Sequence, residues 1–184
     1  MKFIKTEISD VYIIEPTVFG DNRGYFLESF KLEKFEENIY PIKFVQDNES
    51  KSSKGVLRGL HFQKPPFEQA KLVRCIEGRV LDVAVDIRKE SPTYGKHLAV
   101  ELSGENKRQL FIPRGFAHGF SVLSESAIFA YKVDNTYAPE SDSGIRFDDK
   151  ELNIDWGLSE EEIQLSAKDK NLILFKDLDS PFKF

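Results

Sequence analysis

Alternation of apolar and polar residues is the main periodic signal in the chain. In the segment 80–88 (VLDVAVDIR) large aliphatic residues occupy every second position, and this period of two predicts a β-strand. Similar β-rich runs predict further strands at 11–14, 25–30, 71–76, 97–102, 109–113, 119–123 and 127–133. Glycines separate most of these runs and indicate turns between them.

Helical patterns are rare. Residues 31–39 (KLEKFEENI) show helical spacing, and Ser159 followed by Glu162 predicts a capping box that opens a second short helix. Many strands with few helices between them favour an antiparallel sandwich or barrel over βαβ units. The irregular, acidic segment from Tyr137 onward is expected to wrap this barrel, so we expect one domain over residues 1–184.

Composition supports a globular chain and excludes several partners. The chain has 184 residues, of which 40% are hydrophobic and 31% charged, typical of a self-sufficient core. The net charge of −5 argues against attachment to nucleic acid or to an anionic membrane. There is no apolar run long enough to span a membrane, and the N-terminus lacks the apolar core of a signal peptide. The single Cys75 excludes an internal disulfide and suits a reducing compartment, so we expect a cytoplasmic protein.

Two of the three histidines lie in strand-rich segments with recognisable neighbours. His118 ends the sequence PRGFAH (113–118), which fits the P-x-G-x-x-H pattern of the second cupin motif, so a cupin-type jelly roll is the predicted fold. A metal-binding cupin also needs two histidines one residue apart in its first motif. Here that stretch reads His61-Phe62-Gln63, so we expect no metal.

The chain resembles the dTDP-4-dehydrorhamnose 3,5-epimerase family over essentially its whole length. The segments that carry the resemblance lie at 19–30 (FGDNRGYFLESF), 44–50, 55–63 (GVLRGLHFQ), 69–95, 112–120, 131–140 and 165–171 (LSAKDKN), together with DWG around Trp156. The resemblance implies proton exchange at carbons 3 and 5 of a dTDP-4-keto sugar, with no cofactor. Both carbons flank the same ketone, so the reaction needs a base, a proton donor and a group that holds the enolate oxygen.

The resemblance assigns four catalytic residues. His61 is the expected base, because imidazole titrates near neutral pH. Asp169 is expected to pair with His61, fix its tautomer and stabilise the imidazolium, as the carboxylate of a hydrolase triad does. Tyr131 is the expected donor on the opposite face of the sugar ring. Lys71 is expected to hydrogen-bond the keto oxygen as its negative charge develops.

The resemblance also implies a set of binding residues. Arg23, Arg58 and Lys168 are expected to bind the diphosphate. The positions expected to line the nucleotide and sugar site are Phe26, Glu28, Gln46, Asn48, His118 and Tyr137. Asp142 departs from the family, since many relatives carry Glu at this position, and this leaves one contact open. The family's usual state is a homodimer that exchanges N-terminal strands, so Arg23 and Glu28 are expected to reach the neighbour's site.

Three other functions are weighed against this one. A relative that epimerises one carbon only, or that acts on another nucleotide sugar, is not separated by any local motif. A cupin that binds a sugar nucleotide without turnover is disfavoured, because binding alone does not require base, acid, donor and cation together. A metal-dependent dioxygenase is disfavoured by Gln63, which stands where a second histidine ligand belongs.

Overall fold

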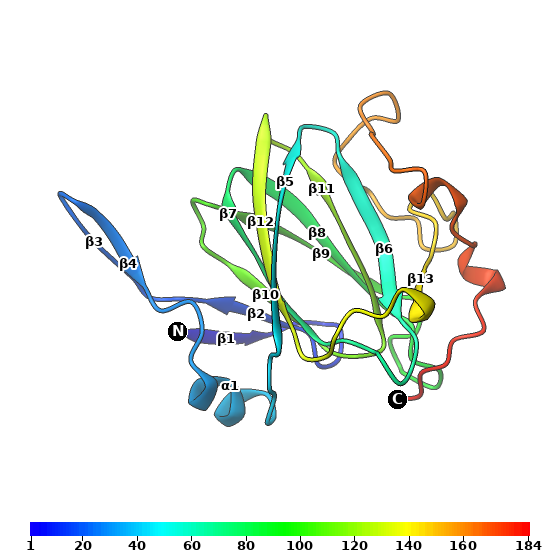
Figure 1. Ribbon diagram of the computed structural model, residues 1–184, viewed down its shortest axis with the longest axis horizontal. Helices are drawn as coiled ribbons and strands as arrows, with labels where there is room; N and C mark the ends of the chain where they lie inside the picture. Colours follow the sequence, from blue (N-terminus) through cyan, green and yellow to red (C-terminus); the bar gives the residue numbers. More distant parts are fainter.

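Two antiparallel sheets face each other and form a flattened barrel (Figure 1). The computed structural model describes residues 1–184. The first sheet has the strand order β1-β2-β10-β7-β12-β5. Its strands are β1 (Lys2–Lys5), β2 (Tyr12–Glu15), β10 (Gln109–Ile112), β7 (Lys71–Glu77), β12 (Ser126–Val133) and β5 (Gln46–Ser53).

The second sheet has the order β13-β6-β11-β8-β9, and a separate ribbon pairs β3 with β4. These strands are β13 (Asp142–Gly144), β6 (Leu57–Gln63), β11 (Phe116–Val122), β8 (Arg79–Asp86), β9 (His97–Ser103), β3 (Val18–Asp21) and β4 (Gly24–Leu27). The helices are α1 (Leu32–Asn38) and the 3-10 helices η1 (Pro139–Ser141), η2 (Asp169–Asn171) and η3 (Phe175–Asp177). The expected mainly-β barrel is therefore confirmed, and all eight predicted strand segments contain a strand.

The space between the sheets holds the main core. Alternate residues of each strand face inward, and they include Val73, Val80, Leu110, Phe120 and Phe129, all buried. The rings of Phe120 and Phe129 stack with their centroids 4.2 Å apart, joining the two sheets. This core closes one part of the interior, and polar side chains line the rest.

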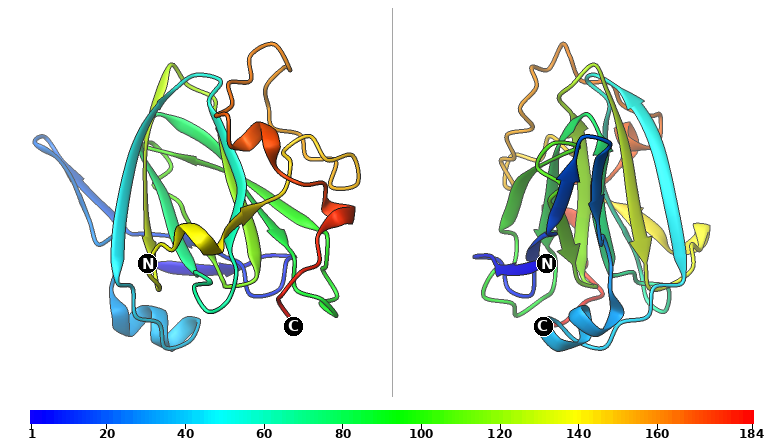
Figure 2. Two further views of the ribbon diagram at one scale, coloured as in Figure 1. Left: turned by 45° about the vertical axis from the view of Figure 1, so that its right-hand side comes forward. Right: turned by 90° about the vertical axis from the view of Figure 1, so that its left-hand side faces the viewer.

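The C-terminal segment covers the outer face of the second sheet, as expected (Figure 2). Val83 and Val85 of β8 pack in one buried cluster with Trp156, Phe175 and Phe182. Because the chain covers this face, both faces of β8 are buried. The polar positions of the alternating segment 80–88 therefore point into the protein and not to solvent.

Helix α1 lies at residues predicted to be helical and packs its buried Phe35 against the first sheet. The prediction of a second helix after Ser159 is wrong, since residues 160–162 form a turn. Ser159 does form the expected contact, since its N–H donates to the Glu162 carboxylate at 3.0 Å. The chain then turns away because the N–H of Gln164 donates to the carbonyl of Gly55 at 2.8 Å, which draws the segment alongside β6. None of the helices is long and apolar enough to cross a membrane.

The β3–β4 ribbon projects away from the barrel (Figures 1 and 2). Its apolar side chains remain exposed, with Phe19 61%, Tyr25 58% and Phe26 69% accessible. Exposed apolar groups gathered on one element are typical of a surface that another molecule covers.

Strands β6 and β11 approach each other unusually closely. His61 and His118 are direct partners across this pair, and the register shifts just beyond them. A Cβ atom at Gly59 would lie 2.5 Å from the Cα of Gly119, and Gly59 has φ +135°. Only glycine fits there. The close approach places the two histidines side by side at one end of the interior.

Candidate active site

A cavity of about 910 Å³ lies among strands of both sheets and the segments that precede β13 and η2. This volume suits a ligand of nucleotide size. The cavity brings together ten of the fourteen residues predicted for the site. They are Asn48, Arg58, His61, Lys71, His118, Tyr131, Tyr137, Asp142, Lys168 and Asp169.

The His61 ring and the Asp169 carboxylate lie against each other at one wall of this cavity. Nε2 of His61 lies 2.6 Å from Oδ1 of Asp169. The Asp169 side chain is only 4% exposed, and its other oxygen accepts a hydrogen bond of 2.6 Å from the hydroxyl of Ser166. Nδ1 of His61 is buried and has no hydrogen-bond partner in the protein. With Nε2 facing the carboxylate, Nδ1 is the nitrogen left with a lone pair.

The carboxyl of Asp169 stays ionised in this setting. Burial pushes its pKa upward, but the hydrogen bonds from His61 and Ser166 together outweigh burial and hold the pKa below its ordinary value. An ionised carboxylate beside an imidazole stabilises the imidazolium that forms when the ring takes up a proton.

Lys71 lines the cavity from β7 and lies next to the second histidine, His118. Its Nζ lies 3.5 Å from Nδ1 of His118, and Nε2 of His118 lies 2.9 Å from Oδ2 of Asp82. The His118 side chain is 8% exposed and that of Asp82 is fully buried. Three polar side chains from three strands thus form one row of contacts.

Burial lowers the pKa of Lys71 to about 8, although Asp82 and Asp142 act in the opposite direction. Burial also lowers the pKa of His118, and the pull of Asp82 toward a charged ring does not overcome it. At neutral pH this row therefore carries a cationic lysine next to an uncharged imidazole. A cation of this kind can stabilise an oxyanion that forms in the cavity.

Tyr131 reaches the cavity from β12, where Phe129 is the inward residue two positions before it. Burial raises the pKa of its phenol, the nearby Arg58 lowers it and Asp142 raises it, with a net increase. The hydroxyl therefore keeps its proton at neutral pH and is able to donate it.

Tyr137, Asp142 and Lys168 form a small network at the exposed edge of the cavity. The Tyr137 hydroxyl donates to Oδ2 of Asp142 at 2.9 Å, and the Lys168 ammonium group forms an ion pair with the same oxygen. The Tyr137 side chain is exposed, so one face of its ring is free to stack on a ligand. Arg58 lies nearby and donates to the hydroxyl of Ser52 at 3.2 Å.

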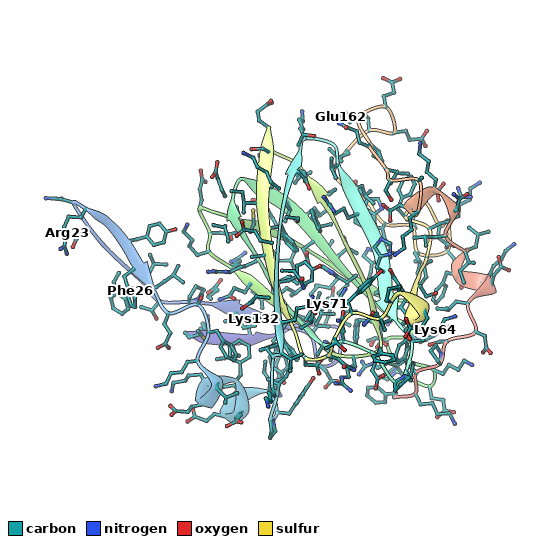
Figure 3. All side chains as sticks on the ribbon, viewed as in Figure 1. Arg23, Phe26, Lys64, Lys71, Lys132 and Glu162 are labelled. Atoms are coloured by element: carbon teal, nitrogen blue, oxygen red, sulfur yellow. The ribbon has the colours of Figure 1, made fainter.

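Four predicted residues do not reach the cavity of their own chain. Arg23 and Phe26 lie on the projecting ribbon, far from Lys71 (Figure 3), and Glu28 follows them on an exposed stretch. Arg23 pairs with its neighbour Asp21. Gln46 lies at the start of β5 and donates to the Asn48 side chain at 2.8 Å.

The structure also reveals side chains that sequence reasoning missed. Asp82 and Ser166 are the partners of His118 and Asp169, and the only sequence signal for Asp82 was an acid within the alternating strand 80–88. Gln63 is taken up by backbone groups, since its amide donates to Phe67 and Thr136 and accepts from Ala138. It fixes the segment that carries Tyr137. No three His, Cys, Asp or Glu side chains come together in a group that could hold a metal ion.

Known proteins share both this sequence and this fold. The model of the family described as dTDP-4-dehydrorhamnose 3,5-epimerase matches residues 5–177. A dTDP-4-dehydrorhamnose 3,5-epimerase of Shigella flexneri is 58% identical over 97% of this chain and 98% of its own length. A dTDP-4-dehydrorhamnose 3-epimerase of Streptomyces niveus is 37% identical over 92% of this chain and 82% of its own.

A solved structure completes the comparison. It is the dTDP-6-deoxy-D-glucose-3,5-epimerase of Legionella pneumophila in complex with dTDP-4-keto-L-rhamnose, and it matches with a TM-score of 0.95 and 50% identity over 100% of this chain and 98% of its own. Sequence and fold therefore agree over nearly the whole length. The chain belongs to the dTDP-4-dehydrorhamnose 3,5-epimerase family and is an isomerase with a cupin-type fold.

Proposed function

We propose that the cavity inverts carbons 3 and 5 of dTDP-4-dehydro-6-deoxy-D-glucose and so forms dTDP-4-dehydro-L-rhamnose, a step of dTDP-L-rhamnose biosynthesis. The observation that carries this proposal is the pairing of His61 with the buried Asp169 in the same cavity as Lys71 and Tyr131. Each C–H bond to be broken lies next to the 4-keto group, so the substrate itself supplies the acidity. The reaction then requires only proton transfer, and we propose no cofactor.

His61 is the base in this proposal. Its imidazole accepts the proton from carbon 3 or carbon 5, and the electron pair of that C–H bond moves into an enolate. Asp169 holds the ring with Nε2 toward the carboxylate and stabilises the positive charge that results. A correctly placed base of this kind contributes about 10²- to 10⁴-fold to the rate.

Lys71 and Tyr131 complete the chemistry. The Lys71 ammonium group donates a hydrogen bond to the keto oxygen, where the negative charge of the enolate collects. Tyr131 returns a proton to the other face of the same carbon, which inverts its configuration. The raised pKa of Tyr131 keeps that proton available at neutral pH.

The polar edge of the cavity binds the nucleotide. Arg58 and Lys168 are its cations and suit the diphosphate, with Arg58 able to form bidentate contacts. Tyr137 stacks on the nucleotide base. Asp142, which also pairs with Lys168, orients the Tyr137 ring by accepting a hydrogen bond from its hydroxyl. Asn48 and His118 contact the nucleotide and sugar from the strands.

We further propose a homodimer in which the β3–β4 ribbon of one subunit completes the site of the other. The exposed apolar side chains of the ribbon require a cover that their own chain does not give. A twofold exchange covers them and brings Arg23, Phe26 and Glu28 to the partner's cavity. Gln46 is the first residue of β5, and we propose that the incoming ribbon meets it there.

The deciding experiment is proton NMR of the purified protein with dTDP-4-keto-6-deoxyglucose in deuterium oxide. We expect loss of the proton signals at both carbon 3 and carbon 5, with formation of the L-sugar product. A protein that binds the nucleotide, seen as shifted thymidine signals, but exchanges neither proton would contradict the proposal.

A second candidate is an epimerase of one carbon only. The similarity to the 3-epimerase of Streptomyces niveus supports this candidate. The sequence identity to that protein is 37%, however, against 58% to the 3,5-epimerase of Shigella flexneri. Deuterium entering at carbon 3 alone would favour it. In either case we place the reaction in the cytoplasm, where the buried free thiol of Cys75 remains reduced.

A further inference from the structure

Asp82 has no role in the chemistry described so far, yet it lies fully buried at the centre of β8 with a direct contact to the active-site wall. A buried carboxylate is costly unless its environment uses it. We propose that Asp82, acting through His118, is a positioning residue for Lys71, which it holds with its ammonium group toward the keto oxygen. This inference rests on the role of Lys71 in the proposed function.

The contacts fix the direction of each hydrogen bond in the row. The Asp82 carboxylate is an acceptor, so Nε2 of His118 must carry the proton that it donates over 2.9 Å. An uncharged His118 then has a bare lone pair at Nδ1. That lone pair accepts one N–H of Lys71 across 3.5 Å. With the opposite tautomer, an N–H of His118 would face the ammonium group and repel it.

The surroundings leave Lys71 few other partners. The ionisable groups that act on it are Asp82 on β8 and Asp142 on β13, with His118 on β11 making the only hydrogen bond. Asp142 is already engaged by Tyr137 and Lys168. The ring of His118 is itself held by stacking against Phe129, with centroids 6.3 Å apart and planes 20° from parallel. One N–H of Lys71 is thus tied down, and the other two remain for a ligand.

The free oxygen of Asp82 supports a second effect on the same lysine. Oδ1 of Asp82 is buried without a hydrogen-bond partner, so its negative charge is not neutralised locally. This charge raises the pKa of Lys71 against the larger effect of burial. Removing it would lower that pKa, and Lys71 would lose its proton at a lower pH.

The test is a double-mutant cycle between Asp82→Asn and Lys71→Ala. Asp82→Asn alone is expected to lower kcat by about 10- to 100-fold, as loss of an outer partner commonly does, with little change in the KM for the dTDP-sugar. The alkaline limb of its pH profile should move to lower pH. In the Lys71→Ala background Asp82→Asn should have no further effect on kcat, because the group on which it acts is gone.

The results distinguish a failure of the inference about Asp82 from a failure of the proposed role of Lys71. An additive loss in the double variant would overturn the inference and leave the role of Lys71 intact. An unchanged kcat in Lys71→Ala would overturn the proposed role of Lys71 and this inference with it. Asp86→Asn is the matched control, since Asp86 is a buried aspartate of the same strand that bonds Arg88, Ser91 and Thr93 outside the cavity. It should lower the unfolding temperature without moving the pH profile.

A measurement on the unaltered protein does not depend on variant folding. Nitrogen-15 NMR of the histidine rings reports the tautomer of His118, with His118→Asn used to assign its signals. We expect a neutral ring with the proton on Nε2 at pH 7. A proton on Nδ1, or a doubly protonated ring, would overturn the inference.

Discussion

The imidazole of His61 and the carboxylate of Asp169 lie 2.6 Å apart although they come from strand β6 and from a 3-10 helix near the end of the chain. The strand faces the cavity, and the C-terminal segment crosses the second sheet before it delivers the acid. Folding of the whole chain is therefore required to assemble the proposed base.

Asp169→Asn should lower kcat by about 10²- to 10⁴-fold, because the amide can neither fix the same tautomer of His61 nor stabilise its charged form. The Kd for dTDP should stay unchanged, since the pair acts on the sugar ring. Calorimetric titration with dTDP and the deuterium-exchange assay measure the two effects. His61→Ala should abolish exchange in the same way, and near wild-type turnover in that variant would contradict the mechanism.

Tyr131→Phe should separate proton removal from proton return. The variant retains the base and the cation, so deuterium should still enter carbon 3 or carbon 5, while inversion should fall well below exchange. NMR of the recovered sugar distinguishes retained from inverted product. Equal loss of exchange and inversion would instead assign Tyr131 to binding or folding.

The rate should fall on the alkaline side with a midpoint near the pKa of Lys71, about 8. The reason is that Lys71 stabilises the enolate only while it carries its proton, and burial makes it lose that proton earlier than an exposed lysine. Tyr131 does not produce this limb, because its pKa is raised. The profile of kcat/KM against pH measures the free enzyme.

Lys71→Arg provides the control for this profile. Arginine remains charged throughout the accessible pH range, so any activity that it retains should show no limb near pH 8. A limb at the same pH in this variant would assign it to another group.

Mixing two inactive variants tests whether the ribbon serves the partner. Arg23→Ala and His61→Ala lie on different parts of one chain, so a mixed dimer would contain one site with both native residues. Random exchange of subunits should restore about a quarter of the wild-type rate. Arg108→Ala, which alters an exposed ion pair with Glu15 on the barrel, is a control that should stay active alone. No recovery on mixing would show that Arg23 serves the site of its own chain and would contradict the exchange.

Asp142→Asn should tighten binding of dTDP by about two- to fivefold at low salt, the range expected from an ion pair whose lysine is exposed. The amide keeps an acceptor for the Tyr137 hydroxyl but removes the negative charge that now engages Lys168. Lys168 is then free for the diphosphate. Asp148→Asn, which breaks the ion pair with Arg146, is the matched control and should leave Kd unchanged. Weaker binding in Asp142→Asn would show that its charge helps the nucleotide.

Sequence patterns predict the strands whose two faces differ in hydrophobicity and fail where they do not. Strand β8 was predicted correctly because large aliphatic residues occupy one face. Strand β5 (QDNESKSS) has no apolar residue at all, since one face lines the polar cavity and the other is exposed. No periodicity of hydrophobic residues can reveal such a strand.

The same limit applies to the site. The resemblance to a known family supplied the pairing of His61 with Asp169, which no local spacing implies. Asp82 was seen only as the polar member of an alternating strand, and it is buried because its face of β8, which also carries Val80 and Ala84, looks toward the facing sheet. The packing of the two sheets is a tertiary contact, so the sequence pattern alone could not show which acids are inside.

Alternation along β12 has a consequence for how this protein can change in evolution. Tyr131 faces the cavity, while the next residue, Lys132, faces outward and pairs with Asp47. Deleting one residue before them within the strand would exchange these two orientations and place an amine where the phenol belongs. Insertions and deletions are therefore excluded from the strands that hold the chemistry. The segments that carry Tyr137 and Lys168 can vary in length, and new substrate ranges should arise there.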